Sequence, residues 1–483
     1  MATPDEALTL QQPLNYADSR KLSISNEPLQ ERRWRLLKQI GLVLCASSGH
    51  IASGAILTWP SPGIASIKED NTTLVGTEIT LTDVQKDMTG SMVSLGYLFG
   101  AWGAGAIVSI IGRRRSMQVI FLPFLIGWIL NALAPNAETL VTARFILGTA
   151  CGSTNVAASS YVCELADTKV RGMMATIPTF GIVLGGLYTV WIGNSMPWHY
   201  LCFVCLIPAI VMLFLFSFVL PFSPSFMVVK GRYEESKRIL NRLRGNYCDI
   251  DSEMNDLKKR NNPTDGTKNQ GYLSLLKAPH ARRIVYVMFL FFAQQFAGDY
   301  VFIVYTTRVL EQAGAPIKPG VATIISAAVR IGGTLACVLL LDRLGRRMLL
   351  IISHVLNAMS LIILGAYVHS RDQSQDEDRD TYEQLTWVPL LCVLIKMFVM
   401  DLGAHPVPYI LANEYFPTAV RSQAASICCS FGIGFSFISL QFYTPMTDLL
   451  TQAGLYWTYA AVSVIAVAFT FVAVTETKGI SVG

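Results

Sequence analysis

Four ionisable residues lie inside long apolar stretches of the chain, where charge is expensive. Arg330, Lys396 and Asp401 each interrupt such a stretch, and His405 follows Asp401 by about one helical turn. A charged side chain at the centre of a membrane helix costs about 2.5–3.5 kcal/mol on insertion scales. These groups are therefore expected either to pair with one another or to line a water-filled path.

The sequence leaves more than one role open for these charges. Arg330 could form an ion pair with Asp401, or its guanidinium could bind an anionic group of a substrate. We favour the ion pair if the two stretches pack together, because an arginine with a nearby acid usually pairs with it. Asp401 and His405 could also carry a proton.

A second set of charges occurs twice along the chain. Gly112-Arg113-Arg114 resembles the later Asp342-Arg343-Leu344-Gly345-Arg346-Arg347, and Glu164 precedes Arg171 by the same distance at which Glu414 precedes Arg421. This recurrence predicts two copies of one unit. Transporters are often built this way, with the substrate site between the copies.

Carboxylates and arginines at helix ends can form charge-assisted hydrogen bonds. We expect such pairs to act as a gate network, formed when a pore opens outward and broken when it opens inward. The alternative is a set of ordinary interfacial ion pairs, which are individually weak. The network comprises Arg113, Arg114, Glu164, Arg171, Asp342, Arg346, Arg347, Glu414 and Arg421.

The elements that would position these residues are membrane helices. The 483 residues are 52% hydrophobic and 15% charged, against about 25% charged in soluble domains. About 20 apolar residues suffice to cross a bilayer, and twelve runs approach that length. They lie at 38–60, 88–111, 117–135, 139–162, 173–195, 199–221, 284–307, 320–341, 347–369, 386–412, 422–446 and 454–474.

These runs predict an all-α polytopic membrane protein of twelve transmembrane helices in two six-helix halves. The expected divisions are a cytosolic tail, a first six-helix bundle, a cytosolic linker with short helices, a second six-helix bundle and a short cytosolic end. They cover residues 1–37, 38–221, 222–283, 284–474 and 475–483, respectively.

Basic residues predict the orientation of the helices. The side that holds both termini and the linker carries 29 of the 38 lysines and arginines, and the opposite side carries six. Positive loops face the cytoplasm, so both termini are expected there. Asn71-Thr72-Thr73 is an N-glycosylation sequon in the first outer loop, which suits a glycoprotein of the cell membrane.

Several functions are not supported by the sequence. The net charge of +5 comes from residues in loops rather than on one face, so no nucleic-acid partner is expected. The cysteines show no metal-binding spacing, and neither a P-loop nor a nucleophile–base constellation stands out. We therefore expect no enzyme activity, no metal and no cofactor. The expected partners are a small solute and the lipid bilayer, and the protein is expected to work as a monomer.

Short motifs in a fixed order add a family resemblance. From about residue 40 to Gly479 the chain resembles the sugar-porter branch of the major facilitator superfamily, including insect facilitative trehalose transporters and mammalian facilitative glucose transporters. The matching motifs are Gly112-Arg113-Arg114, Gly148-x3-Gly152-x8-Tyr161-x2-Glu164-x6-Arg171-Gly172, Pro221-x-Ser223-Pro224 with Gly231-Arg232, Gln294-Gln295-x-x-Gly298, Asp342-Arg343-x-Gly345-Arg346-Arg347, Pro406-x-Pro408 with Glu414-x-Phe416-Pro417, and Glu476-Thr477-Lys478-Gly479.

The resemblance implies facilitative transport of a small polar solute by alternating access, with trehalose or a hexose as the family default. It adds Glu476 to the gate network. Gln294 and Gln295 keep the family's amide pair, whose donors and acceptors match sugar hydroxyls. The alternatives are a non-sugar, anionic solute bound by Arg330 and a non-transporting nutrient sensor on the same fold.

The chain also departs from the family pattern. Ser109, Phe222 and Ser225 replace gating charges, so the network is expected to be weaker in the first half. Much of the family's sugar-binding amide set is replaced by other side chains. The expected substrate-binding residues are Gln294, Gln295, Thr179, Tyr300, Arg330, Tyr409, Asp401 and His405.

Overall fold

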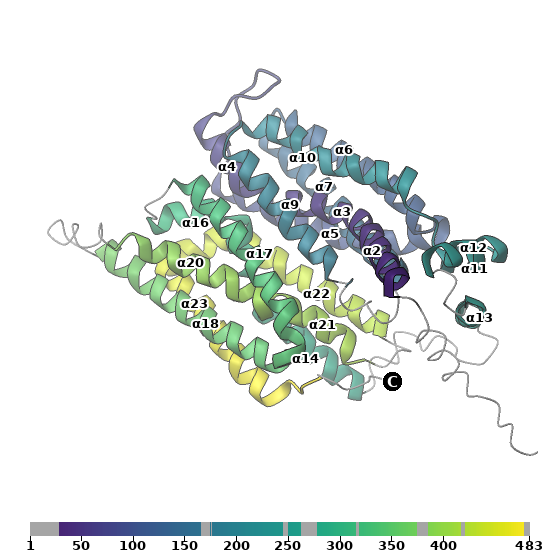
Figure 1. Ribbon diagram of the computed structural model, residues 1–483. Coiled ribbons are helices and arrows are strands. Elements are labelled where there is room, and N and C mark those ends of the chain that lie inside the picture. The colour runs from purple at the N-terminus through teal and green to yellow at the C-terminus, as the bar shows by residue number, and fades with distance from the viewer. Residues whose placement is uncertain are drawn as a thin grey trace, which may run out of the picture.

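The computed structural model describes residues 29–165, 174, 176–244, 250–261, 278–314, 318–373, 385–416 and 421–477. Over this part of the chain the protein is helical apart from loops and one isolated β-bridge between Thr72 and Glu78. The prediction of an all-α protein is therefore confirmed. Figure 1 shows two groups of long helices lying side by side.

The first group of helices runs from the N-terminal side of the chain to the linker. Its long helices are α2 (Leu29–Ala46), α3 (Ser48–Thr58), α4 (Pro60–Glu69), α5 (Asp83–Ile111), α6 (Arg113–Ala132), α7 (Ala137–Leu165), α9 (Ile177–Gly193) and α10 (Trp198–Phe214), which a π-helical turn continues over Leu215–Val219. Three short helices follow, α11 (Pro224–Val229), α12 (Tyr233–Arg244) and α13 (Ile250–Asn261).

The second group contains several interrupted helices. It consists of α14 (Ala278–Phe296), α15 (Asp299–Val304), α16 (Thr306–Ala313), α17 (Pro319–Leu344), α18 (Arg346–Gln373), α20 (Trp387–Val399), a π-helical turn (Met400–Ala404), α21 (Pro406–Glu414), α22 (Arg421–Gln441) and α23 (Tyr443–Ala473). α14 with α15, and α20 with α21, each form one broken span.

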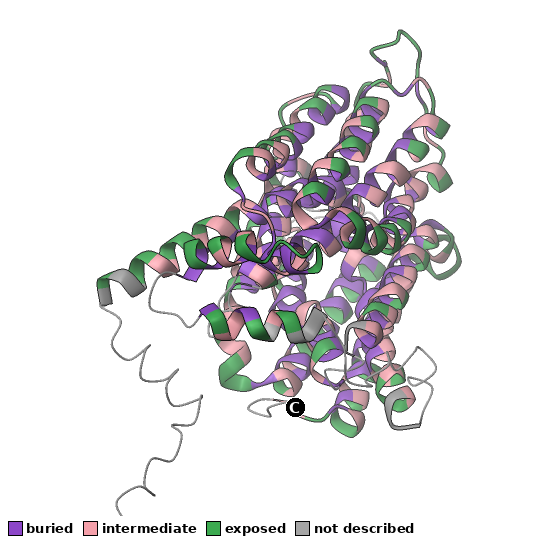
Figure 2. Ribbon diagram, turned by 90° about the vertical axis from the view of Figure 1, so that its right-hand side faces the viewer, coloured by how far each residue is buried: buried purple, intermediate pink, exposed green. Residues whose placement is uncertain are grey.

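Among the described residues, ten helical segments are long and apolar enough to cross a membrane. α9 is a shorter apolar helix, and α7 is 29 residues long. With these two, each of the twelve predicted runs coincides with a helix. Large apolar side chains such as Trp191, Phe218 and Val472 are more than half exposed, which suits contact with lipid tails. Figure 2 shows exposed positions along the outer surfaces of the helices and buried ones between them.

The hydrophobic cores separate along the sequence. The buried residues of one core all lie between Val43 and Leu243, whereas those of two others lie between Val287 and Val474. Between the two groups, α5 packs along α22 and α9 packs along α17. Ser94 and Ser436 share a hydrogen bond of 3.0 Å across the α5–α22 contact.

The two ends of the bundle are distinguished by their charges. We call the end where Gly112 leads into α6 and Gly345 leads into α18 the arginine end, because Arg113–Arg115 and Arg346–Arg347 begin these helices. The two glycines have similar backbone angles, with φ of +79° and +85°, which agrees with the repeat in the sequence. The opposite end, where α5 begins and α22 ends, is called the far end.

Candidate functional site

Two helix breaks in the second group bring polar residues together in the middle of the bundle. Gly298 separates α14 from α15 with φ of +82°, a conformation that L side chains rarely adopt. A Cβ atom there would also lie 2.8 Å from the ring of Tyr459. The second break is the π-helical turn Met400–Ala404. Broken spans free backbone groups for ligands or side chains.

Lys396 satisfies one of the freed backbone groups. Its Nζ donates to the carbonyl oxygen of Gly298 at 3.0 Å and lies 4.3 Å from the centroid of the Phe302 ring. The side chain is almost fully buried, with 1% exposure. A buried ammonium is tolerated when its donors have partners, so Lys396 supports the break between α14 and α15.

Asp299, Gln294 and His405 form a compact polar cluster beside this break. Asp299 Oδ2 lies 2.5 Å from His405 Nδ1 and accepts a hydrogen bond from Gln294 Nε2 at 3.1 Å. Gln294 Nε2 is also 3.1 Å from His405 Nδ1. Gln294 and Asp299 lie on either side of the break at Gly298, and His405 directly follows the π-helical turn, so the cluster connects the two helix breaks. Asp299 is a functional candidate that the sequence reasoning missed, although an acid directly after Gly298 in an apolar run was a signal for it.

Arg330 and Asp401 form the second buried pair. Arg330 Nε donates to Asp401 Oδ2 at 2.7 Å, and Nη2 lies 3.4 Å from Oδ1. Both side chains are less than one-tenth exposed. This geometry agrees with the ion-pair interpretation of Arg330, because a forked contact of this kind occupies the donors that an anionic solute would need.

Gln295, which follows Gln294 on α14, is a buried polar side chain without a protein partner among the described residues. It has no exposed surface, and neither its Oε1 nor its Nε2 is hydrogen-bonded; Gln294 Oε1 is also unpartnered. An unpaired buried amide is costly. The site therefore contains free donors and acceptors of the kind that a hydroxyl group satisfies.

Aromatic rings complete the surroundings of the cluster. The rings of Tyr300 and His405 are stacked, with centroids 6.1 Å apart. The centroid of the Tyr409 ring lies 6.0 Å from that of His405. Both tyrosines are partly exposed. Thr179 is half-buried on α9 in the first group of helices. Seven of the eight predicted substrate-binding residues thus lie in the second group, on or beside the broken spans or on α17.

At the arginine end, the first copy of the repeated charges is built around Glu164. Arg113 Nη2 lies 2.8 Å from Glu164 Oε1, and the Ser223 hydroxyl donates to the other carboxylate oxygen. Arg114 donates to the carbonyl oxygens of Phe216, at 2.7 Å, and Ser217. The structure thus brings Arg113 and Glu164 together, while Arg114 holds the end of the sixth span.

The second copy is built around Glu414. Arg346 Nη2 donates to Glu414 Oε1 at 2.9 Å, and the Thr477 hydroxyl donates to Glu414 Oε2. Asp342 is 3.4 Å from Arg346, one helical turn away. Glu476 accepts the backbone N–H groups of Arg346 and Arg347 at 3.0 Å each.

Each of these ion pairs joins residues of the same group of helices. Arg113–Glu164 and Arg346–Glu414 therefore do not by themselves tie one group to the other, and the predicted gating role remains a prediction. Arg171 lies outside the described residues, as does the side chain of Arg421.

Asn71 is partly exposed in the loop between α4 and α5. Its carbonyl oxygen accepts the N–H of Ile79 at 2.8 Å, and its glycosylation also remains a prediction.

Comparison with known proteins places the chain in a family. The family described as "Sugar (and other) transporter" matches residues 21–482. The chain belongs to this family. Its members are transporters rather than enzymes, which confirms that part of the prediction. As a member of this family, the chain is a multi-pass membrane protein.

Curated relatives of the sugar transporter family include the facilitated trehalose transporter Tret1 of Drosophila virilis. It is 28% identical over 445 residues, which cover 91% of this chain and 47% of the relative. The Tret1 of Aedes aegypti is 28% identical over 442 residues, covering 91% of this chain and 54% of the relative. The chain therefore spans about half the length of these curated relatives.

Solved structures show the same fold. The inward open conformation of the E. coli xylose transporter XylE superimposes with a TM-score of 0.74 at 22% identity, over 92% of this chain and 98% of that one. A partially occluded inward open conformation of XylE gives a TM-score of 0.72 at 22% identity, over 92% and 99%. The predicted major facilitator fold of twelve helices is thereby confirmed.

Proposed function

We propose that this protein carries a small, uncharged, polyhydroxylated solute, of the sugar class, across the cell membrane by facilitative alternating access. The two bundles, 38–221 and 284–474, move relative to each other about the broken spans, and the linker 222–283 joins them. The arginine end, where the described chain begins with α2 and where α23 ends, faces the cytoplasm, and the excess of basic residues on that side supports this orientation.

The observation that carries this proposal is the buried, unpartnered amide of Gln295. An amide has both donors and an acceptor, and a sugar hydroxyl can satisfy either. The partly exposed rings of Tyr300 and Tyr409, which both lie beside the ring of His405, suit the apolar face of a sugar ring. The curated trehalose transporters that the chain resembles support the same solute class.

The charges of the site favour an uncharged solute over an anion. Arg330 is neutralised by Asp401, and Lys396 donates to the Gly298 carbonyl. An anion would have to compete with the Asp401 carboxylate for the same guanidinium. A neutral solute needs only hydrogen bonds, which Gln295 leaves available.

The test is uptake by the purified full chain in liposomes. Labelled trehalose, glucose and a panel of organic anions are offered to the parent and to Gln295→Ala, with Gln118→Ala as the matched control. Gln118 is also an amide on a membrane helix, but it contacts Ser217 at the arginine end. We expect sugar uptake that Gln295→Ala lowers about tenfold or more and that Gln118→Ala leaves unchanged.

Other outcomes would contradict the proposal. Uptake of anions alone, abolished by Arg330→Ala, would indicate the anionic alternative. No uptake of any solute by correctly inserted protein would indicate a sensor. Sugar accumulation driven by an imposed pH gradient would overturn the facilitative mechanism, and would assign a proton to Asp299, Asp401 or His405.

A further inference from the structure

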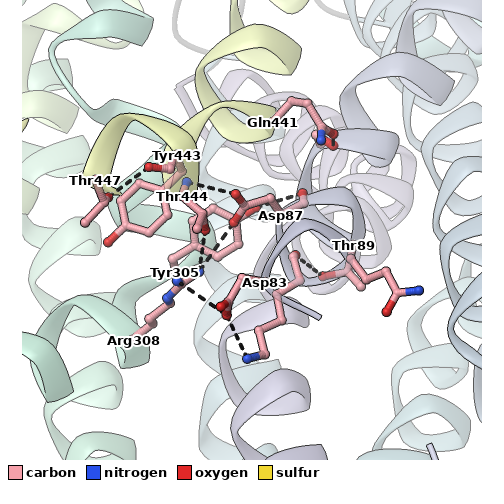
Figure 3. Close-up of polar contacts among 12 residues, drawn as sticks. Asp83, Asp87, Thr89, Tyr305, Arg308, Gln441, Tyr443, Thr444 and Thr447 are labelled. Atoms are coloured by element: carbon pink, nitrogen blue, oxygen red, sulfur yellow. Dashed lines mark hydrogen bonds and ion pairs between the residues drawn. The ribbon is translucent and has the colours of Figure 1, made fainter. Parts of the chain in front are cut away.

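A buried carboxylate of the first bundle is held by the second bundle at the far end. Asp87 lies on α5 and has no exposed surface. Its Oδ2 accepts the backbone N–H of Thr444, on α23, at 2.8 Å. Its Oδ1 lies 3.4 Å from Nη1 of Arg308, on α16. Figure 3 shows Asp87 directed towards both residues.

The residues around this carboxylate form one further contact between the bundles, from Tyr305 to Asp87, and hold one another in place within the second bundle. Arg308 Nη1 donates to Thr444 Oγ1 at 3.2 Å, and its guanidinium lies 5.2 Å from the centroid of the Tyr443 ring. The Tyr305 hydroxyl donates to the backbone oxygen of Asp87 at 2.9 Å. Tyr305 and Tyr443 are stacked, with centroids 5.3 Å apart. We call Asp87, Tyr305, Arg308, Tyr443 and Thr444 the far-end cluster (Figure 3).

Two neighbouring contacts show that the closure extends beyond the cluster. Ser61, on α4, and Thr307, on α16, share a hydrogen bond of 2.7 Å. Ser91, one turn along α5 from Asp87, donates to Gln441 at 2.7 Å. Both contacts cross between the bundles, and Ser91 is fully buried. The far end is therefore closed in this structure by polar contacts from α4 and α5 to α16, α22 and α23.

The charges of the far-end cluster depend on one another. Removing one partner of a buried ion pair leaves the other charge uncompensated, which is costly. If the bundles separate at the far end, Asp87 and Arg308 part and water solvates both. The contact therefore stabilises one of two states, and a contact made in one state shifts the equilibrium towards that state.

We propose that Asp87 and Arg308 form a latch that holds the far end of the transporter closed. This inference rests on the alternating access of the proposed function, but its test requires no solute. The latch differs from the charge pairs at the arginine end because it joins one bundle to the other. Neutralising either partner shifts the protein towards the state that is open at the far end.

Asp83 provides a matched control on the same helix. It lies one turn before Asp87 and is also near Arg308, at 3.9 Å, but its side chain is 59% exposed and pairs with Lys86 at 2.9 Å. Solvent screens such an exposed charge. Asp83→Asn therefore removes the same charge from the same helix without removing the buried contact.

The test measures how often the far end opens. Ser91→Cys introduces a thiol at a buried position of the far-end interface. The full chain carrying it is treated with a membrane-impermeant thiol reagent in liposomes, and labelling at position 91 is followed by peptide mass spectrometry. We expect Asp87→Asn to raise the labelling rate about fivefold, on the scale of one interfacial ion pair, and Asp83→Asn to leave it unchanged.

Arg308→Gln tests the same contact from its other partner. The Arg308 side chain is 23% exposed whereas that of Asp87 is fully buried, so the loss of Arg308 should be better tolerated. This variant therefore serves as the test if Asp87→Asn does not fold. The double variant Asp87→Asn/Arg308→Gln should label no faster than the faster single variant, since both act through one contact. Unchanged labelling in folded Asp87→Asn or Arg308→Gln, or equal labelling in Asp83→Asn, would overturn the latch. A labelling shift without transport of any solute would leave the latch standing and overturn the proposed function.

Discussion

The two arginine-end clusters share a core and differ at one adjacent position. In the first bundle, Arg113 pairs with Glu164, which also accepts the Ser223 hydroxyl. In the second bundle, Arg346 pairs with Glu414, which also accepts the Thr477 hydroxyl. Ser223 and Thr477 therefore occupy equivalent places. The residues before them are Phe222 and Glu476, and these are not equivalent in chemistry.

The difference changes how the neighbouring helix begins. The Glu476 carboxylate accepts two backbone N–H groups at the start of α18, where the helix leaves its first N–H groups unpaired and carries partial positive charge. In the first bundle the guanidinium groups of Arg114 and Arg115 lie over the Phe222 ring instead, at 4.5 and 5.9 Å. Both copies therefore retain the ion pair, whereas the carboxylate that caps the next helix is present in the second copy.

The largest effect is expected from Glu476→Gln. It removes a charged cap that serves two N–H groups, which is worth about 1–2 kcal/mol. Thermal unfolding of the detergent-solubilised protein should therefore occur several degrees lower. Phe222→Leu, at the equivalent position, should change the midpoint little. Equal midpoints for Glu476→Gln and the parent would show that the cap adds no stability.

A smaller and unequal effect is expected when the two central acids are neutralised. Glu164→Gln should lower the unfolding temperature more than Glu414→Gln, each by the equivalent of about 1 kcal/mol or less. Arg346 retains Asp342 at 3.4 Å after its partner is lost, and Glu476 still anchors the start of α18. The same thermal assay decides the order, and the reverse order would contradict this account of the two copies.

The smallest effect is expected from Phe222→Glu, which gives the first bundle the capping residue of the second. The added carboxylate should stabilise the start of α6 by about 0.5 kcal/mol, offset in part by lost contacts of the ring with Arg114. Phe222→Gln is the control, since it has a similar shape to glutamate without the charge. A lower midpoint for Phe222→Glu than for Phe222→Gln would contradict the expectation.

Much of the fold followed from the sequence alone. Apolar runs of about 20 residues have few stable solutions in a bilayer, because each backbone polar group must be satisfied within the helix. All twelve predicted runs coincide with helices, and Gly112 and Gly345 mark equivalent positions in the two copies. Pairs between an acid and an arginine at matching helix ends were also expected from the repeat, but the sequence did not specify which arginine each acid would contact.

The breaks in the helices were not predicted, and they determine the candidate site. The sequence places Asp299 and His405 in different apolar runs, 106 residues apart. Only the left-handed Gly298 and the π-helical turn at Met400–Ala404 bring these side chains within 2.5 Å of each other. Periodicity indicates a helix but does not indicate where its hydrogen bonding will be interrupted.

The membrane helices, their duplication and the arginine end could be predicted from the sequence, because they depend on local hydrophobicity and on short motifs. Which charges meet across the interface between the two bundles depends on the tertiary structure. Asp87 and Arg308 are 221 residues apart and Asp87 and Thr444 are 357 apart, and from sequence each looked like a loop or helix-end residue. Their contact depends on how two separately packed bundles approach each other, which no local pattern of residues specifies.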